Sequence, residues 1–286
     1  MINKYGRDAR AVPLFAYLWR AKEIAGVMKW GAVIVAAGRG KRMGASDNKV
    51  FLPLAGRAVL AHALDAFERC GLVEEIVVVA AADEIERVKA LVRGETDDAR
   101  LEEAVERGLS ADRREGGVLN GSAAFAKVSQ VVAGGAERQG SVEAGLLALA
   151  TDGVLVHDAA RPLVTPELIA ACCEAAERVG AAAAAVPVKD TIKVVEGGMI
   201  VSTPERASLL AVQTPQAFGR QALLDAHRAA RAAQVAATDD AMLFERLGLR
   251  VAAVPGQESN LKITTPEDLL VAELIVERRR RGTGKA

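Results

Sequence analysis

The sequence predicts an α/β fold built around a mostly parallel sheet. Short runs rich in Val and Ile alternate along the chain with longer segments whose apolar residues recur at helical spacing. The short runs are apolar almost throughout, as in strands that helices cover on both faces. Strands that alternate with helices form βαβ units, and such sheets bind ligands at the carboxyl ends of their strands. We therefore expect a binding site at that edge.

Each element follows from a local pattern. Residues 32–36, 75–80, 153–157 and 183–188 read as buried strands. Residues 59–70 and 141–150 carry apolar side chains at intervals of three and four, as helices do. Pro166 is expected to open another helix, with Thr165 as its N-cap.

Two segments depart from this alternation. Residues 83–127 are long and rich in charge, and we interpret them as a solvated helical excursion rather than a binding element. Within residues 190–218, two short strand-like runs flank Gly197-Gly198, which is a signal for a two-residue hairpin turn. A hairpin is not needed inside a βαβ body, so the segment at about 189–218 is a candidate arm for gripping a second subunit.

The charge balance argues against two classes of partner. Lys and Arg together number 37, as do Asp and Glu, so the formal net charge is +0. Neither nucleic acid nor an anionic membrane is indicated by such a balance. The longest apolar run is broken by Pro187 and Lys189, and is too short to span a bilayer. We expect neither nucleic acid nor membrane as a partner.

The N-terminal residues differ in composition from the rest. Aromatic residues make up 3% of the chain, yet Tyr5, Phe15, Tyr17, Trp19 and Trp30 all fall within the first thirty positions. We expect residues 1–29 to be a dispensable leader, residues 30–276 a single domain and residues 277–286 a basic tail. A targeting or surface-docking role for the leader, or an upstream start, stays open.

Cysteine usage points to a reducing compartment. Cys70, Cys172 and Cys173 are an odd number, two of them adjacent, with no spacing typical of zinc ligands. We interpret them as buried thiols of a cytoplasmic protein.

The most informative stretch follows the first strand. Ala36, Ala37, Gly38 and Gly40 are small enough for a ligand to approach the backbone, and Arg39, Lys41 and Arg42 add positive charge, with Lys49 further on. The glycine spacing fits neither a Walker A loop nor a dinucleotide fingerprint. Several cations over one loop suit a triphosphate. From these residues alone, a merely basic surface loop remains open.

Further motifs accompany this loop. In chain order they are Gly38-Arg39-Gly40-Lys41-Arg42-Met43 with Lys49; Gly134-Gly135-Ala136-Glu137-Arg138-Gln139-Gly140-Ser141-Val142; His157-Asp158-Ala159-Ala160-Arg161-Pro162; Pro187-Val188-Lys189-Asp190-Thr191; Gln213-Thr214-Pro215-Gln216-Ala217-Phe218; Thr238-Asp239-Asp240-Ala241; and Asn260-Leu261-Lys262-Ile263-Thr264. From about Trp30 to Val276 the chain resembles the 2-C-methyl-D-erythritol 4-phosphate cytidylyltransferase family of the non-mevalonate isoprenoid pathway. One departure is Asn48-Lys49-Val50, where the family usually has Pro-Lys-Gln, which puts the rigidity of the loop in question.

The resemblance implies a fold and a reaction. The fold is a Rossmann-like, mostly parallel sheet of the nucleotide-diphospho-sugar transferase type, with the projecting β-hairpin as a dimerisation arm. The reaction joins a cytidylyl group from CTP to 2-C-methyl-D-erythritol 4-phosphate, giving 4-diphosphocytidyl-2-C-methyl-D-erythritol and pyrophosphate. The implied cofactor is Mg²⁺. A homodimer with shared active sites is also implied.

The resemblance also implies roles for single residues. Its catalytic residues correspond to Arg42, Lys49, Arg220 and Lys262. Its nucleotide-binding residues correspond to Ala36, Ala37, Gly38, Gly40, Gly134, Gly135 and Ser141. Its substrate-binding residues correspond to Asp158, Arg161, Thr191, Arg220 and Lys262. Asp158 is also the expected Mg²⁺ ligand, the alternative being a residue that only caps the turn at Ala159. Thr191 and Arg220 are expected to reach the neighbouring subunit's site.

Two other functions are weighed. A ribitol-5-phosphate cytidylyltransferase would share the loop, the nucleotide pocket and the mechanism. A non-catalytic nucleotide-binding homologue would not need both the triphosphate pair and the substrate-positioning pair, whereas this chain has Arg42, Lys49, Arg220 and Lys262.

Overall fold

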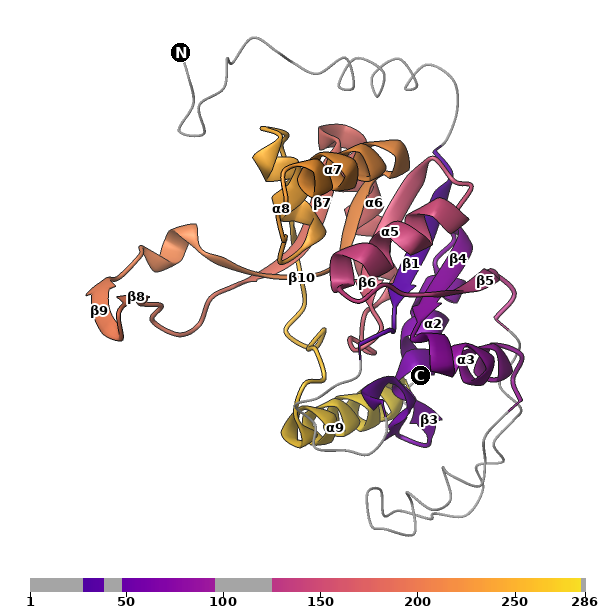
Figure 1. The fold of residues 1–286 in the computed structure, drawn as a ribbon. Helices are drawn as coiled ribbons and strands as arrows, with labels where there is room; N and C mark the ends of the chain where they lie inside the picture. The colour runs from indigo at the N-terminus through magenta and orange to yellow at the C-terminus, as the bar shows by residue number, and fades with distance from the viewer. Residues whose placement is uncertain (1–27, 39–47, 96–124, 284–286) are drawn as a thin grey trace.

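A computed structural model describes residues 28–38, 48–95 and 125–283. These residues form a seven-stranded sheet with helices on both faces, in the strand order β11-β7-β10-β6-β1-β4-β5 (Figure 1). The predicted α/β class with a mainly parallel sheet is confirmed.

The parallel half of the sheet lies around β1 (Trp30–Val35). On one side, β1 pairs in parallel with β4 (Val73–Ala80), and β4 pairs with β5 (Val128–Ala133). On the other side, β1 pairs in parallel with β6 (Gly153–Asp158). The sequence analysis missed β5, because this edge strand is only partly buried and polar residues interrupt its apolar run.

The other half of the sheet contains a reversed strand. β7 (Ala181–Pro187) pairs in parallel with β11 (Ala252–Pro255). Between β7 and β6 lies β10 (Leu210–Gly219), which runs antiparallel to both. β7 follows α6 (Pro166–Val179) directly, and the helix ends at Gly180, whose φ of 107° suits glycine. Thr165 caps α6 as predicted, accepting a hydrogen bond from the backbone of Leu168.

Helices cover the two faces of the sheet in separate apolar clusters. α2 (Val59–Arg69) and α6 contribute to the core on one face, with α3 (Ile85–Val92) beside them. α5 (Arg138–Ala148), α7 (Arg220–Ala232) and α8 (Asp240–Arg246) pack on the other face. Gly145 lets α5 approach β1 closely, since a Cβ there would lie 2.5 Å from Val33. None of the helices in the described ranges is long and apolar enough to cross a membrane.

A third, smaller apolar cluster lies under the last helix. α9 (Pro266–Thr283) places Leu269, Ala272 and Val276 against residues from a small hairpin, β2 (Pro53–Leu54) and β3 (Arg57–Ala58), and its surroundings. The helix continues past Val276, so the start of the predicted basic tail is helical. Arg279 donates a hydrogen bond to the carbonyl of Leu163, 3.0 Å away.

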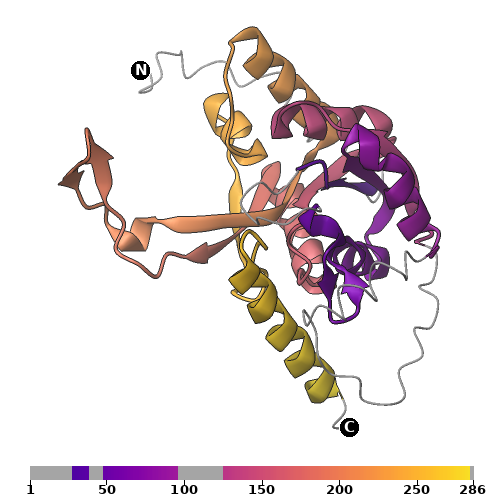
Figure 2. The same cartoon turned by 60° about the horizontal axis from the view of Figure 1, so that its bottom comes forward.

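The predicted hairpin is present and projects from the body (Figures 1 and 2). β8 (Val194–Glu196) and β9 (Met199–Ser202) pair antiparallel around Gly197 and Gly198, which both have positive φ angles. Apolar side chains on this hairpin are exposed, among them Met199 and Ile200. The arm is shorter than predicted, because residues 213–218 lie in the central sheet as part of β10.

The charged excursion and the leader are described only in part. The predicted excursion, residues 83–127, begins in η3 (Ala82–Glu84) and α3, and Phe125 near its end is buried in the core. Residues 96–124 lie outside the described residues, as do 1–27. Trp30 is fully buried and its Nε1 donates to Oε1 of Glu177, 3.0 Å away, so Trp30 belongs to the packed body.

Candidate active site

The site lies where β1 and β6 end. The two strands are parallel and in register, with Val35 opposite Asp158, so Ala36, Ala37 and Gly38 emerge beside Asp158. This is the carboxyl edge at which the sequence places the ligand. Gly40 and Arg42 lie outside the described residues.

Asn48 restrains the chain just before Lys49. Its side-chain nitrogen donates to the carbonyl of Ala36 at 3.3 Å and to Oε2 of Glu84 at 2.8 Å. Its side-chain oxygen accepts from the backbone of Val50 and caps η2 (Lys49–Phe51). The buried Asn48 thus ties this turn to the end of β1. Side-chain hydrogen bonds here supply rigidity that the family's usual proline would give through its ring.

Lys49 and Lys262 come from distant parts of the chain to the same edge. Nζ of Lys49 donates to the carbonyl of Ile263 at 2.9 Å. The backbone of Ile263 in turn donates to the carbonyl of Ala160 at 2.8 Å. The segment that carries Lys262 therefore lies between Lys49 and the loop that follows Asp158.

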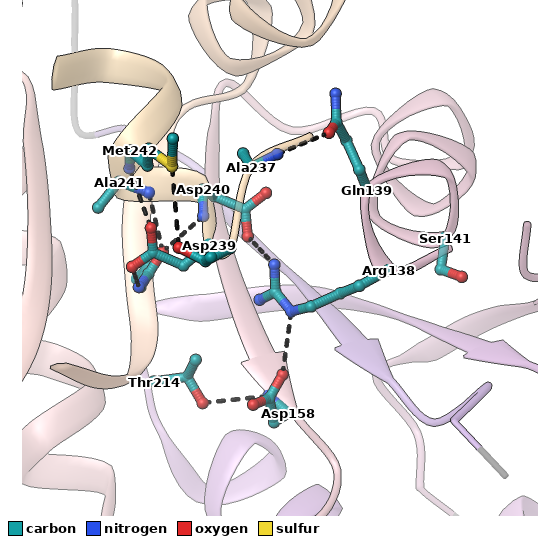
Figure 3. Close-up of polar contacts among 12 residues, drawn as sticks. Arg138, Gln139, Ser141, Asp158, Thr214, Ala237, Asp239, Asp240, Ala241 and Met242 are labelled. Carbon is teal, nitrogen blue, oxygen red and sulfur yellow. Dashed lines mark hydrogen bonds and ion pairs between the residues drawn. The ribbon is translucent and has the colours of Figure 1, made fainter. Parts of the chain in front are cut away.

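Asp158 is held between two cations. Its Oδ2 lies 2.6 Å from Nζ of Lys262, and its Oδ1 lies 3.4 Å from Nε of Arg138 (Figure 3). Burial alone would raise the pKa of this carboxyl group, but the charges of Arg138 and Lys262 outweigh burial and lower it. Asp158 therefore stays ionised at neutral pH, with a partly exposed ammonium group beside it.

Arg138 is fixed from its other side by Asp240. Nη1 of Arg138 lies 2.7 Å from Oδ2 of Asp240 (Figure 3). Oδ1 of Asp240 lies 3.1 Å from Nε2 of the buried His227. Burial alone would lower the pKa of Arg138, but the negative charges of Asp240 and Asp158 outweigh burial and raise it. We did not assign Arg138 a role from sequence, although it stands inside the glycine-rich motif that ends at Ser141.

The glycine pair packs against the first loop. A Cβ on Gly134 would lie 2.6 Å from that of Ala37 and 2.7 Å from Oγ of Ser141, so only glycine fits. Gly135 has similarly little room beside Gly140. Helix α5 begins at Arg138, three residues earlier than predicted, and its N-terminus therefore follows the glycine pair directly. Among the small residues expected to bind the nucleotide, Ala37, Gly134 and Ser141 thus lie together.

Arg161 braces the loop beside Lys262. Its Nη1 donates to the carbonyl of Asn260 at 2.8 Å, while its buried Nε has no hydrogen-bond partner within the described residues. Burial lowers the pKa of Arg161, with Asp158 opposing the shift.

Arg220 does not lie in the site of its own subunit. Its Nε donates to the carbonyl of Thr151 at 2.7 Å and its Nη1 to that of Leu146 at 3.3 Å. The preceding residue, Gly219, pairs with Gly153 at the start of β6. Because β10 runs antiparallel, its last residue lies at the amino edge of the parallel strands, opposite the site. Arg220 therefore lies away from Asp158 of its own subunit, and its expected role in a neighbouring subunit's site stays a prediction.

Thr191 is exposed between β7 and β8, in the segment that leads out to the hairpin. Figure 2 shows this segment leaving the body. Thr191 is thus on the arm, as predicted, and its expected role in a neighbouring subunit stays a prediction.

The carboxylate of Asp158 fits Mg²⁺ that is held by one protein ligand and by the substrate. No group of three or more His, Cys, Asp or Glu side chains with metal-ligand geometry occurs in the described parts of the chain. A single ionised carboxylate is nevertheless suited to Mg²⁺, which commonly takes one or two protein carboxylates and completes its shell with substrate phosphates and water.

Fold and site together define a nucleotidyltransferase: small residues at the end of β1, a glycine pair against them, Lys262 paired with an ionised aspartate, and Lys49 bonded to the residue that follows Lys262. A family profile of 2-C-methyl-D-erythritol 4-phosphate cytidylyltransferase matches residues 31–278. The chain belongs to this family.

Individual relatives agree with the family profile. The chain is 45% identical to the 2-C-methyl-D-erythritol 4-phosphate cytidylyltransferase of Halalkalibacterium halodurans over 255 residues, which cover 89% of this chain and 100% of the relative. It is 44% identical to that of Geobacter metallireducens, over 86% of this chain and 97% of the relative. Similar solved structures are the cytidylyltransferase of Thermus thermophilus (TM-score 0.62, 33% identity, 86% of this chain and 98% of that one) and the 4-diphosphocytidyl-2C-methyl-D-erythritol synthase of Anaerococcus prevotii (TM-score 0.67, 28% identity, 87% and 99%).

Proposed function

We propose that this protein transfers the cytidylyl group of CTP to 2-C-methyl-D-erythritol 4-phosphate, as a step of isoprenoid precursor synthesis. The observation that carries the proposal is the pairing of Lys262 and Arg138 with the ionised Asp158 at the end of β6, with Lys49 bonded to the backbone of Ile263 next to Lys262. Membership of the family supports the choice of both substrates and disfavours ribitol 5-phosphate and a non-catalytic role.

The reaction needs positioning more than proton transfer. A phosphate oxygen of 2-C-methyl-D-erythritol 4-phosphate forms a new bond to the α-phosphorus of CTP, the bond from that phosphorus to the bridging oxygen breaks, and pyrophosphate leaves. A phosphate dianion is already a nucleophile, so no general base is required. Catalysis then consists of in-line alignment and of neutralising negative charge as it develops.

Each part of the site takes one of these tasks. Arg42 and Lys49 neutralise the triphosphate, and Lys262 and Arg161 face the phosphate and hydroxyl groups of the sugar alcohol. The backbone of Ala36, Ala37, Gly38 and Gly40 cradles the phosphates. Gly134, Gly135 and Ser141 contact the base, because their small size admits a pyrimidine edge.

Asp158 would hold Mg²⁺ at this site. When bound, the ion would neutralise the phosphate oxygens of CTP and hold them in place. Asp158 also holds Lys262 at hydrogen-bond distance, so the ammonium group is already oriented toward the substrate side. Titrating the protein with Mg²⁺ and CTP by calorimetry, for the wild type and for Asp158→Asn, tests this assignment. Equal Mg²⁺-dependent CTP binding by both would reject it.

A substrate panel tests the activity. The protein is incubated with CTP, Mg²⁺ and either 2-C-methyl-D-erythritol 4-phosphate or ribitol 5-phosphate, and pyrophosphate release is followed. We expect faster turnover with the methylerythritol substrate. A preference for ribitol 5-phosphate would overturn the proposal. Absence of turnover with both substrates would favour a non-catalytic nucleotide-binding homologue.

The arm supports a homodimer with shared sites. Its exposed apolar side chains, including Val195, Met199 and Ile200, need a cover, and a second copy supplies one by symmetry. In that dimer, Thr191 would enter the neighbour's site.

Mixed dimers test the sharing. Thr191→Ala and Lys49→Ala subunits are denatured together and refolded in equal amounts. With shared sites, half of the dimers are mixed and one of their two sites has neither defect, so activity should recover to about a quarter of the wild-type value. Activity no higher than the mean of the two variants alone would argue against sharing.

The three cysteines support a cytoplasmic location. All of them are free and buried. Burial raises the pKa of Cys172 to about 12 and raises that of Cys173 further, so these thiols are unreactive and suit a reducing compartment.

A further inference from the structure

Two buried polar residues stand at the root of the arm. β10 carries the chain from the arm into the sheet (Figure 2), and its pairing with β7 is irregular between Val212 and Gln216. Val212 is still 47% exposed, whereas Gln213 and Thr214, which follow it, are 6% and 4% exposed. Buried polar groups need hydrogen-bond partners, and the partners of these two lie in the loops of the active site.

Thr214 is bonded to the end of β6. Its Oγ1 accepts a hydrogen bond from the backbone N–H of Asp158 at 3.1 Å (Figure 3) and lies 3.0 Å from Nδ1 of His157. Nε2 of His157 lies 3.1 Å from the carbonyl oxygen of Arg161, which only accepts, so Nε2 carries the proton. Nδ1 is then an acceptor, and the Thr214 hydroxyl donates to it. One hydroxyl thus fixes both His157 and the backbone of Asp158.

Asn260 makes the matching connection on the other loop. Its side-chain nitrogen donates to the carbonyl of Thr214 at 2.8 Å and to Oε1 of Gln213 at 3.2 Å. Asn260 is fully buried and stands two residues before Lys262. Gln213 also donates to the carbonyl of Gln257 at 3.0 Å. The loop that presents Lys262 is therefore fastened to the same two residues of β10.

We propose that Thr214 and Asn260, with Gln213, are positioning residues that set Asp158 and Lys262 against each other. No covalent segment joins the two site loops nearby, since Lys262 and Asp158 are 104 positions apart in sequence. The two loops are bonded directly through Ile263 and Ala160 and through Arg161 and Asn260, and both are also held by the root of the arm. The seating of β10 therefore contributes to the 2.6 Å pairing of Lys262 with Asp158. The inference rests on the roles proposed for Asp158 and Lys262 and adds residues that contact no substrate.

The first test removes one hydroxyl. Thr214→Val keeps the shape of the side chain but leaves the N–H of Asp158 and Nδ1 of His157 without their partner. We expect kcat to fall by about 10- to 100-fold, as small displacements of reacting groups do, with KM for CTP changed much less because Gly134 and Gly135 are untouched. Thr214→Ser, which restores the hydroxyl, should recover most of kcat. A Thr214→Val enzyme with wild-type kcat would overturn the proposal, as would failure of Thr214→Ser to exceed Thr214→Val.

A matched control separates positioning from stability. Thr151 is also a buried threonine beside β6, but at the opposite edge of the sheet, where its hydroxyl donates to the carbonyl of Gly153 at 3.0 Å. Thr151→Val should lower the melting temperature as Thr214→Val does, yet keep the wild-type kcat. Equal losses of kcat in both would show a general effect of stability and overturn the proposal.

Two further variants keep the outcome unambiguous. If Thr214→Val does not fold, Gln213→Met takes its place, since it removes the acceptor for Asn260 while keeping a side chain of similar length. We expect a lower kcat, with a melting temperature lowered no more than in Thr151→Val, and an unchanged kcat would overturn the proposal. Asp158→Asn is assayed alongside. If it is fully active, the role proposed for Asp158 fails, whereas an inactive Asp158→Asn with a fully active Thr214→Val rejects only the positioning role.

Discussion

Nζ of Lys262 lies 2.6 Å from Oδ2 of Asp158, and the carboxylate is far more buried than the ammonium group. The pair is therefore asymmetric. Asp158 is anchored in the protein by β6 and Arg138, while Lys262 presents its charge toward the open side. A buried anion that orients an accessible cation is suited to receiving a phosphate group.

Removing the ammonium group should affect turnover more than stability. In Lys262→Met, Asp158 keeps Arg138 as its partner, so the fold is retained. Loss of one charge-stabilising donor typically costs about 100-fold or more in kcat, and we expect a loss of that order in steady-state pyrophosphate release. Lys89→Met is the control, because Lys89 pairs with the exposed Glu86 at the surface. Equal activities of the two variants would contradict the assignment.

His157 should make stability depend on pH. Burial lowers its pKa from 6.5 to about 4, so the folded protein keeps this ring neutral while the unfolded chain binds a proton below pH 6.5. The contribution of the neutral His157 to the free energy of unfolding is thus complete above pH 6.5. It is lost as the pH falls toward 4, and the loss amounts to about 3 kcal/mol. Urea unfolding at a series of pH values measures the slope. His157→Gln should show a smaller fall of the free energy of unfolding with decreasing pH. Parallel plots of this free energy against pH for the variant and the wild type would contradict the prediction.

Gly134→Ala should impair nucleotide binding. The added methyl group would overlap Ala37 and Oγ of Ser141, so the first loop must move away from the glycine pair. We expect a destabilisation of about 1–3 kcal/mol and weaker CTP binding by calorimetry. Gly71→Ala is the control, since no atom lies within 4 Å of a Cβ at that position. Wild-type affinity in Gly134→Ala would show that the loop does not need this contact.

Arg220→Met should lower stability without lowering turnover. The side chain donates to two backbone carbonyls at the amino edge of the sheet, and their loss should cost about 1–2 kcal/mol in the free energy of unfolding. Thermal unfolding and a kcat measurement on the same sample check both parts. A loss of kcat beyond tenfold in a folded variant would return Arg220 to the catalytic machinery.

Local patterns in the sequence predicted much of the fold. The runs that became β1, β4 and β6 are apolar almost throughout because helices cover both faces, and Gly197-Gly198 set the hairpin turn. β5 was missed because an edge strand buries only part of its residues. The reversal of β10 was missed as well, since strand direction depends on distant partners rather than on local pattern. That one reversal places Arg220 at the edge of the sheet opposite Asp158 of the same subunit.

Site prediction succeeded for residues next to strand ends. Asp158 and Gly38 could be placed because the end of a parallel strand has a known position in the sheet. The supporting residues Arg138 and Asp240 stood in motifs that the sequence analysis quoted, but nothing in either motif shows that the two side chains meet. Their pairing joins residues that are 102 positions apart and follows only from the packing of α5 beside α8.

β7 has a consequence for synthesis of the chain. Its residues 181–185 are all alanine, the best helix former, and they follow α6 with only Gly180 between them. The strands on either side of β7 are β10 and β11, which the ribosome makes later. Until β10 and β11 emerge, the alanine run has neither of its neighbouring strands to pair with, and its local preference is helical. Gly180 then separates α6 from the alanine run. Residues 181–185 can pair as a strand once β10 has been synthesised.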